Sequence, residues 1–375
     1  MKPYTGIGQH TKYLFGAMAS LYPDLQILMV TPEPVDVPMP SNVEITVLPE
    51  NFPGTGGMRK TYWEQRQVPQ FFKTKEVDLV HFPYPCNPWN GFGKPVVVTV
   101  HDVIPWESAA YRRSMTTRLY QDSCRFAVKK ADHIFSVSLA SRADVARMCK
   151  VPESKISLSY NAPAPDFSNK ISEEERLKIL QKYHIDPSRR FFLYVGGYDQ
   201  RKNVETLVRV FKASVGPFYD VDLVLAGGKS VEDPLYASFD LLTNHNREGS
   251  LGLQKGKLVP TGFVAEEDLP ALYQSAFLFV HLSTQEGCNL PLLEAAVSGT
   301  PMIASDIAVH HEMVGKLVQF VPSHDEKKIA ECFAEFLNDS NFYQLQKQKL
   351  SAYVCPFTWK KTAGEVFKTY QQLLS

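Results

Sequence analysis

The sequence predicts an α/β protein made of two doubly wound parallel sheets. Short apolar runs, typical of buried parallel strands, alternate with amphipathic helical stretches along nearly the whole chain. The alternation breaks once, between about residues 161 and 190, before a fresh strand begins. The length of 375 residues fits roughly two to three domains of about 150 residues each. Together these observations favour two domains of one class.

The expected strands are apolar runs with turn residues on either side. In chain order they cover residues 27–30, 77–82, 96–100, 133–137, 191–195, 223–226, 277–281 and 301–304. Because right-handed crossovers join parallel neighbours, helices should cover both faces of each sheet.

The expected helices are recognised by apolar residues that recur at i, i+3, i+4 and i+7. One begins at Val204, with Asn203 placed to cap it, and another begins near Leu269. At the chain end, one apolar stripe from Trp359 to Leu373 predicts a packed helix.

The break near residues 161–190 is the predicted domain boundary. It contains the segments NAPAPDF, ISEEERLKILQKY and DPSRR. We expect an N-terminal domain over residues 1–165 and a C-terminal domain over residues 166–355. A C-terminal helix over residues 356–375 should pack back toward the N-terminal domain.

The composition excludes several classes of protein. Lys and Arg number 40 and Asp and Glu number 40, so no overall positive charge gathers nucleic acid. The six cysteines lie far apart without a C-x-x-C pair, which argues against zinc and for reduced, cytoplasmic thiols. No apolar run approaches the ~20 residues of a membrane span, although peripheral association at the inner face of the membrane stays open. Adjacent side chains point in different directions, so we interpret His310 and His311 as surface residues and expect no metal site.

The first candidate site is the segment GGYDQRKN, which follows the strand at 191–195 and opens the helix at Val204. Doubly wound sheets bind ligands at the carboxyl ends of their strands. Gly197 lets a backbone approach an anion closely, and Arg201 and Lys202 supply charge for a phosphate. The segment predicts a diphosphate site; a solvated Arg–Lys pair in a polar loop is the alternative.

The second candidate site is STQEGCNLPLLE, again between an apolar strand and a helix. Glu286 lies in the loop and Glu294 about one turn into the helix, so both carboxylates could face one crevice. Carboxylates accept hydrogen bonds from the hydroxyls of a sugar or a ribose. The alternative places Glu286 on the loop surface and makes Glu294 a first-turn acid that stabilises the helix.

Two further segments give weaker signals. His101 and Asp102 follow the strand at 96–100 and could orient or deprotonate a hydroxyl, although such a pair is more often structural. Gly6 and Gly8 form a Gly-rich turn ahead of a helix, which suits a phosphate. Thr11 takes the place of the later glycine of a dinucleotide fingerprint, which disfavours an NAD site.

Taken together, these segments resemble the retaining glycosyltransferases of family four, the glycosyl transferases group 1, over nearly the whole chain. The family motif with paired glutamates is similar to EGCNLPLLEAAVSGTPMIASD, with Glu286 and Glu294 as the pair. The match continues, in order and spacing, through FFLYVGGYDQRKNVETLV, VPTGFVAEEDLPALYQSA, VTVHDVIPW, ADHIFSVSLASRADV and FTWKKTAGEVFKTY. The resemblance implies the GT-B architecture, in which two Rossmann-like domains face a cleft. The N-terminal domain would bind the acceptor and the C-terminal domain the nucleotide sugar.

The resemblance also implies a role for each candidate residue. Arg201 and Lys202 would hold the donor diphosphate, Glu286 the transferred sugar and Glu294 the nucleotide ribose. His101 would lie near the sugar and the leaving phosphate. The glycines of the N-terminal turn would approach the donor phosphates or the acceptor, residues 262–264 would hold the base, and residues 287–290 would cap the diphosphate. These further donor-site residues are Gly6, Gly8, Gly197, Gly262, Phe263, Val264, Gly287, Cys288, Asn289 and Leu290.

The function that the resemblance implies is transfer of a hexose, with retention, from a nucleoside diphosphate sugar to a saccharide or lipid-linked acceptor in polysaccharide biosynthesis. UDP-glucose is the first donor expected and GDP-mannose the second. The leaving diphosphate itself would deprotonate the acceptor, so neither a metal, a cofactor nor an enzymic nucleophile is required. The alternatives are an isomerase or phosphorylase of the same architecture and a non-catalytic protein that binds a nucleotide sugar.

Two features depart from the family pattern. Asn289 stands where the family usually has glycine, so we expect either a side chain beside the diphosphate or an unusual backbone angle. The chain also begins almost at the Gly-rich turn, whereas family members usually begin with a strand before it. We therefore expect the N-terminal sheet to lack its first strand, which would leave backbone groups that need other partners.

Overall fold

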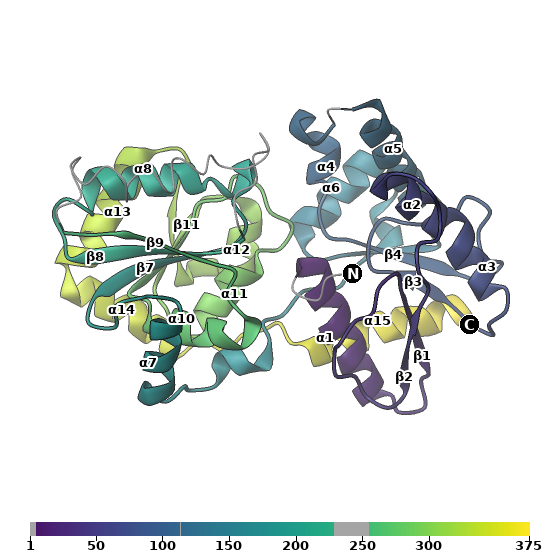
Figure 1. Cartoon of the computed structure of the whole chain (residues 1–375), viewed down its shortest axis with the longest axis horizontal. Coiled ribbons are helices and arrows are strands. Elements are labelled where there is room, and N and C mark those ends of the chain that lie inside the picture. Colours follow the sequence, from purple (N-terminus) through teal and green to yellow (C-terminus); the bar gives the residue numbers. More distant parts are fainter. Residues whose placement is uncertain (1–4, 113, 229–254) are drawn as a thin grey trace. The chain divides into compact units, whose positions relative to one another are not determined.

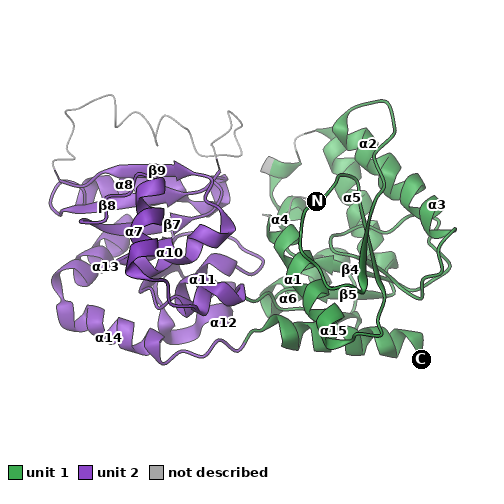
Figure 2. Ribbon diagram, turned by 60° about the horizontal axis from the view of Figure 1, so that its bottom comes forward, with its two compact units in different colours: residues 1–162, 357–375 green, residues 163–356 purple. Residues whose placement is uncertain are grey.

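The computed structural model describes residues 5–112, 114–228 and 255–375, and the chain divides into two compact units (Figure 1, Figure 2). Unit 1 contains Met1–Ala162 and Phe357–Ser375, and unit 2 contains Pro163–Pro356. Each unit combines helices with parallel strands, which confirms the predicted α/β fold class.

Unit 1 holds two separate parallel sheets. Its strands are β1 Ile27–Thr31, β2 Val43–Val47, β3 Val80–Phe82, β4 Val96–Val100, β5 His133–Ser136 and β6 Ile156–Leu158. One sheet pairs β1 with β2, and the other has four strands in the order β3-β4-β5-β6. Every residue of β4 is buried, as expected for the central apolar run VVVTV.

The helices of unit 1 are α1 Gly6–Leu21, α2 Gly56–Tyr62, α3 Val68–Phe72, α4 Ile104–Glu107, α5 Met115–Lys130, α6 Leu139–Cys149 and α15 Trp359–Leu374. Hydroxyl side chains begin four of them: Thr5 caps α1, Ser114 caps α5, Ser138 caps α6 and Thr358 caps α15. Each hydroxyl accepts a hydrogen bond from a backbone N–H of the first turn, which would otherwise lack a partner.

The C-terminal helix α15 belongs to unit 1, as expected for a helix that packs back toward the N-terminal domain (Figure 2). Leu14 and Met18 of α1 form one buried cluster with Ala363 and Val366 of α15 and with Val97 of β4. The end of the chain therefore completes the core of the N-terminal unit.

The two sheets of unit 1 contribute to the same cores although their strands do not pair. Val30 of β1 packs with the cluster that contains Val80 and Phe82 of β3. Ile27 and Leu79 both pack with the cluster of α1 and α15. Within the described residues, no strand precedes α1, and β1 pairs with β2 alone. The sheet layer of this unit is thus in two pieces.

Unit 2 holds one continuous sheet of six parallel strands. They are β7 Arg190–Val195, β8 Val221–Ala226, β9 Leu258–Gly262, β10 Leu278–His281, β11 Met302–Ser305 and β12 Gln319–Val321. Their order is β12-β11-β10-β7-β8-β9. Because β7 and β10 are neighbours, the loops that follow them meet at one edge of the sheet.

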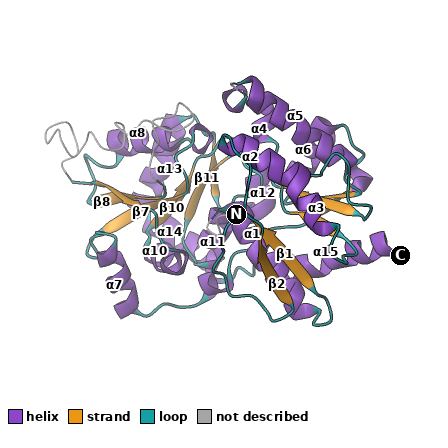
Figure 3. Cartoon of the chain, turned by 45° about the vertical axis from the view of Figure 1, so that its right-hand side comes forward, coloured by secondary structure: helices purple, strands orange, loops and turns teal. Residues whose placement is uncertain are grey.

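The helices of unit 2 are α7 Glu173–Lys182, α8 Val204–Ser214, α10 Leu269–Ser275, α11 Leu290–Val297, α12 Ala308–Val314, α13 Glu326–Asn338 and α14 Ser340–Ser351. They lie on both sides of the sheet (Figure 3). Phe211 of α8 and Phe333 of α13 pack on Phe192 of β7 in the main core. In the parts of the chain that the structure describes, no helix is long and apolar enough to cross a membrane.

Candidate functional site

The loops after β7 and β10 are tied together at the carboxyl edge of the sheet in unit 2. The backbone N–H of Thr284 donates a hydrogen bond to the carbonyl of Arg201 at 2.7 Å. Asn203 lies at the N-cap position of α8, as predicted, with a φ of 54°, but its amide makes no cap bond to that helix. Its Nδ2 donates instead to the carbonyls of Leu282 and Ser323, at 3.3 and 2.7 Å. The amide therefore fixes one loop against the other.

Arg201, Lys202 and Glu286 form a charged centre between these loops. Arg201 Nη1 lies 2.8 Å from Glu286 Oε2, and Lys202 Nζ lies 2.5 Å from Glu286 Oε1. Arg201 Nε also pairs with Asp199, at 2.8 Å. The Glu286 side chain is 6% exposed and the Lys202 side chain 12% exposed. The structure thus brings together three of the predicted site residues, and the loop-surface alternative for Glu286 is wrong.

The two cations of this centre keep the Glu286 carboxyl ionised. Burial opposes ionisation of Glu286, but Lys202 and Arg201 outweigh burial and hold the pKa of the carboxyl well below its usual value. His281, at the end of β10, places Nε2 3.3 Å from Glu286 Oε1. Burial lowers the pKa of His281, although Glu286 partly opposes this shift. The centre therefore holds an ionised carboxylate, two cations and a neutral imidazole.

Glycines let the backbone pack closely behind this centre. Tyr194 of β7 donates its hydroxyl hydrogen to the carbonyl of Gly197 at 2.5 Å, which holds the loop after β7. A Cβ on Gly227, at the end of β8, would lie 1.8 Å from the carbonyl oxygen of Gly196. Because that contact is with backbone, no side chain fits at Gly227, and glycine is required there.

Glu294 is buried in α11 and has a different partner from Glu286. It is 6% exposed, and its Oε2 accepts a hydrogen bond from the Tyr273 hydroxyl at 2.9 Å. Burial raises the pKa of Glu294 to about 7, although Tyr273 opposes the shift. The acid lies beyond the first turn of α11, so the first-turn alternative is wrong. Its predicted role as a ribose ligand stays a prediction.

The segment from Gly287 to Leu290 leads into α11. Asn289 has φ 68° and ψ 68°, the left-handed conformation, which is the unusual backbone angle expected there. Its amide contacts His310 at 2.7 Å, with both residues buried. The prediction that His310 is a surface residue is therefore wrong, because α12 turns this ring into the core while the next ring, His311, stays half exposed. Cys288 is buried against Met313.

The predicted base-binding residues follow β9. Gly262 has φ 70°, a conformation that glycine adopts readily, and its carbonyl accepts a hydrogen bond from the N–H of Gly227 at 2.9 Å. Phe263 is 60% exposed and Val264 is buried. An exposed aromatic ring at the carboxyl edge of the sheet is compatible with stacking on a base.

The remaining predicted residues lie in unit 1. Gly6 and Gly8 belong to the first turn of α1, so the prediction of a separate turn ahead of the helix is wrong: Thr5 already caps the helix at Gly8. His101 follows β4, and its Nε2 lies 3.0 Å from the carbonyl of Pro83. The ring of His10 meets the ring of His101 edge to face, with centroids 4.8 Å apart.

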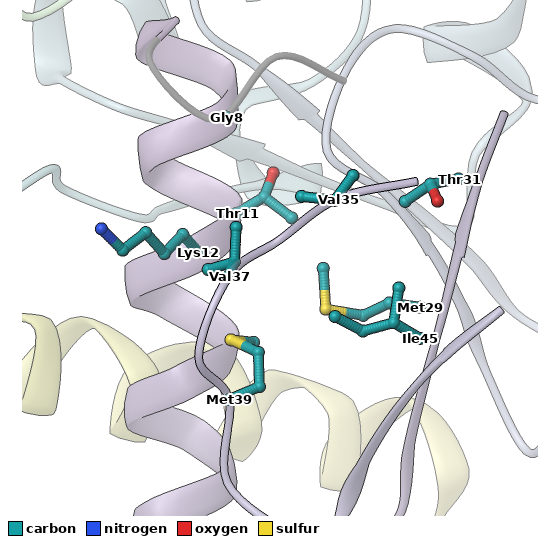
Figure 4. A pocket seen from close by; sticks show the side chains of 9 residues that line it. All are labelled: Gly8, Thr11, Lys12, Met29, Thr31, Val35, Val37, Met39 and Ile45. Atoms are coloured by element: carbon teal, nitrogen blue, oxygen red, sulfur yellow. The ribbon is translucent and has the colours of Figure 1, made fainter. Parts of the chain in front are cut away.

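A small pocket lies between α1 and the strands β1 and β2 (Figure 4). It has a volume of about 30 Å³. Its lining is mainly apolar and consists of Gly8, Thr11, Lys12, Met29, Thr31, Val35, Val37, Met39 and Ile45. A cavity of this size is too small for a sugar, so we do not assign it to a substrate.

The sequence reasoning missed several polar residues of these sites. Tyr273 and His281 lay in recognised segments, and the position of His281 at a strand end was a usable signal. His10 carried no signal by itself, because its partner Asn161 is 151 positions away. Across the described parts of the chain, no three acidic, cysteine or histidine side chains gather closely enough to hold a metal ion.

Two protein-family models match the chain. The model described as Glycosyltransferase Family 4 matches residues 4–167, and the model described as Glycosyl transferases group 1 matches residues 175–352. O-antigen chain mannosyltransferase B of Escherichia coli is 27% identical over 74% of this chain and 70% of that protein. Serotype-specific mannosyltransferase WbdA of Escherichia coli is 25% identical over 79% of this chain, which spans only 35% of that protein.

Solved structures with the same fold cover almost the whole chain. WaaG, a glycosyltransferase involved in lipopolysaccharide biosynthesis, has a TM-score of 0.75 at 17% identity over 97% of this chain and 96% of its own. Anabaena HepE in complex with UDP and glucose has a TM-score of 0.72 at 17% identity over 99% of this chain and 96% of its own. These identities bear on fold alone. With one family model for each half, the chain belongs to the family-four glycosyltransferases of GT-B architecture.

Proposed function

We propose that the protein transfers a hexose, with retention, from a nucleoside diphosphate sugar to a saccharide or lipid-linked acceptor in surface polysaccharide biosynthesis. The observation that carries this proposal is the centre of Arg201, Lys202 and Glu286 at the carboxyl ends of β7 and β10. Ligands of doubly wound sheets bind at this edge, and two adjacent cations suit a diphosphate.

The donor diphosphate would enter the centre by replacing Glu286. Arg201 and Lys202 each hold a carboxylate oxygen of Glu286, so the ion pairs must open before the cations contact phosphate. The released carboxylate is then available to accept hydrogen bonds from the hydroxyls of the donor sugar. The cations stabilise charge that develops on the leaving diphosphate, which itself takes the proton of the acceptor hydroxyl.

A mannosyl donor is the one that we propose first. Two curated relatives are mannosyltransferases of Escherichia coli, and both matches cover more than two thirds of this chain. GDP-mannose, expected second from the sequence, therefore moves ahead of UDP-glucose. UDP-glucose stays the alternative, because HepE, which shares the fold, was solved with UDP and glucose.

The test measures nucleotide binding and transfer on the full chain. Titration calorimetry with GDP, UDP, GDP-mannose and UDP-glucose identifies the nucleotide, and product analysis with oligosaccharide acceptors identifies the sugar and the anomer. We expect Lys202→Ala to weaken nucleotide binding about 10- to 100-fold, because a charge-assisted hydrogen bond is lost. Lys178→Ala is the matched control, since this lysine is 71% exposed on α7 and pairs with Glu174.

The results of these experiments distinguish a transferase from a non-catalytic protein and from a phosphorylase. Equal nucleotide affinity in wild type and Lys202→Ala would remove the diphosphate assignment. A protein that binds a nucleotide but neither transfers nor hydrolyses any sugar would favour the non-catalytic alternative. Release of free sugar phosphate in place of a glycoside would favour a phosphorylase.

A further inference from the structure

We propose that His310 is a positioning residue that holds Asn289 in the left-handed conformation on which the diphosphate loop depends. The diphosphate loop is here residues 283–289, between β10 and α11. The inference rests on the proposed function, because it takes this loop as the place where the donor diphosphate binds. His310 itself does not touch substrate in this proposal.

Asn289 sits in a conformation that favours glycine. Its φ of 68° and ψ of 68° lie in the left-handed region, which asparagine tolerates better than most residues but glycine adopts most readily. It occupies the N-cap position of α11, yet its side chain makes no cap bond to that helix. The Asn289 side chain therefore does not cap α11 and has another role.

His310 is the partner that holds this side chain. Asn289 Nδ2 lies 2.7 Å from His310 Nε2, and Asn289 is 5% exposed and His310 0% exposed. His310 Nδ1 lies 2.8 Å from the carbonyl of Ser305, which can only accept. The hydrogen of the neutral ring is therefore on Nδ1, and Nε2 offers a lone pair to the amide.

The ring stays in this state because burial lowers the pKa of His310 to about 3. The other groups that face the ring are His281, with ring centroids 6.2 Å apart, and the hydroxyls of Ser283 and Ser305. Glu286 and Lys202 act on the ring through the nearby charged centre. A neutral ring can keep its bond to Asn289 at ordinary pH.

A second observation singles out this amide. The Oδ1 atom of Asn289 is buried and has no hydrogen-bond partner among the described residues. His310 thus pairs with the Nδ2 end of the amide, and removing it would leave both polar ends unpaired. Buried polar groups without partners are uncommon and occur where another constraint holds them.

His310 also reaches the other end of the loop. Its Nε2 lies 3.5 Å from the hydroxyl of Ser283, and the hydroxyl of Ser305 bonds to the carbonyl of Ser283. Glu286 lies between these two ends, where it contacts Arg201 and Lys202. The ring therefore braces the segment that carries Glu286 and leads into α11, and its loss should reach nucleotide binding through the loop.

The test is a double-mutant cycle in which the readout is the dissociation constant for GDP and for UDP, measured by calorimetry on the full chain. We expect His310→Ala to weaken binding about tenfold. In the Asn289→Gly background the same change should cost less than about threefold, because glycine needs no side-chain partner to hold this conformation. His310→Gln keeps an acceptor near the Nε2 position and should recover most of the loss.

His311→Ala is the matched control on the same helix, since its side chain is 50% exposed and pairs with Asp306. If His310→Ala does not fold, Asn289→Ala and Asn289→Gly replace it. The proposal expects the alanine variant to bind at least about fivefold more weakly than the glycine variant, because only alanine is strained at this φ.

Each result decides a separate question. Wild-type affinity in His310→Ala, an equal loss in both backgrounds, or equal binding by Asn289→Ala and Asn289→Gly overturns the inference alone. Failure of the wild-type protein to bind either nucleotide overturns the proposed function, and this inference with it.

Discussion

The buried His281 of unit 2 lies beside charged groups, whereas His310 of the same unit and the histidines His10, His81 and His101 of unit 1 have neutral hydrogen-bond partners. In unit 2, His281 lies 3.3 Å from Glu286, a carboxylate that also pairs with two cations. In unit 1, the hydrogen-bond partners of His10, His81 and His101 are amide, hydroxyl and carbonyl oxygens. Burial lowers the pKa of His10 and His81 to about 3 and that of His101 to about 4.

Under the proposed function, this difference would suit the two sites to different ligands. Paired charges can exchange one anion for another, so the centre in unit 2 suits the proposed exchange of the Glu286 carboxylate for phosphate. A neutral imidazole offers one donor and one acceptor, which matches a hydroxyl. We therefore expect charge to dominate at the centre of Arg201, Lys202 and Glu286 in unit 2, and neutral hydrogen bonding to dominate around His10 in unit 1.

The largest effect is expected for Glu286→Ala. The substitution removes the proposed partner of the transferred sugar, and we expect kcat/KM for transfer to fall about 10²- to 10³-fold. Nucleotide affinity should rise, because phosphate no longer has to displace the Glu286 carboxylate from Arg201 and Lys202. Steady-state kinetics and calorimetry on one preparation measure both quantities.

The opposite signs make this experiment informative. Glu174→Ala serves as the control, since the Glu174 side chain is 80% exposed and far from the centre in sequence. Near-wild-type turnover of Glu286→Ala would remove its role in catalysis. A large loss of nucleotide affinity would mean that Glu286 organises the cations instead of competing with phosphate for them.

Glu294→Gln tests a second carboxyl group of unit 2, which differs from Glu286 because burial opposes its ionisation. Burial raises its pKa in the folded chain to about 7, above the ordinary value of 4.5. Between those values the unfolded chain binds fewer protons, so this acid lowers stability as pH rises. We expect Glu294→Gln to gain about 2 kcal/mol in unfolding free energy at pH 8 relative to its effect at pH 5.

Urea unfolding of both proteins at the two pH values measures this gain. Gln keeps an oxygen that can accept the hydrogen bond of Tyr273, so the comparison isolates charge. A gain of the same size at pH 5 and pH 8 would show that Glu294 is protonated at both, or ionised at both, in the folded chain.

The sequence predicted the fold well because its signals are local. All eight expected strands exist, with ends that differ by a few residues; the run at 77–82 forms a strand only over Val80–Phe82. The unpredicted strands have weak local signals: β2 is partly exposed and carries Glu44 and Thr46, β9 is partly exposed and contains Pro260, and β6 and β12 are each 3 residues long. Apolar periodicity cannot identify such strands, because they form through pairing and packing with segments that are distant in the sequence.

The sites were predictable only where neighbours in sequence act together. Arg201 and Lys202 were recognised because both follow one strand. Glu286 was recognised because it follows another strand, whose carboxyl end lies at the same side of the sheet. The pairing of Asn289 with His310 spans 21 positions and depends on how α12 rotates. Likewise, sequence alone could not show that the sheet layer of unit 1 is in two pieces, since pairing is a long-range property.

The smallest effect is expected for His10→Phe, and it tests whether unit 1 buries neutral histidine. The folded chain lowers the pKa of His10 to about 3 from 6.5, so below pH 6.5 the unfolded chain binds more protons. Stability therefore falls as pH falls, by about 1 kcal/mol for this residue between pH 7 and pH 5.5. His10→Phe should flatten this dependence of stability on pH by about the same amount, as measured by urea unfolding at both pH values.

Asn161→Leu is the control, because it removes the 2.7 Å hydrogen bond to His10 but keeps the imidazole. The stability of this variant should depend on pH as steeply as that of the wild type. Equal slopes in His10→Phe and wild type would mean that His10 can be protonated where it lies, and the contrast between the charged surroundings of His281 and the neutral surroundings of His10 would then fail.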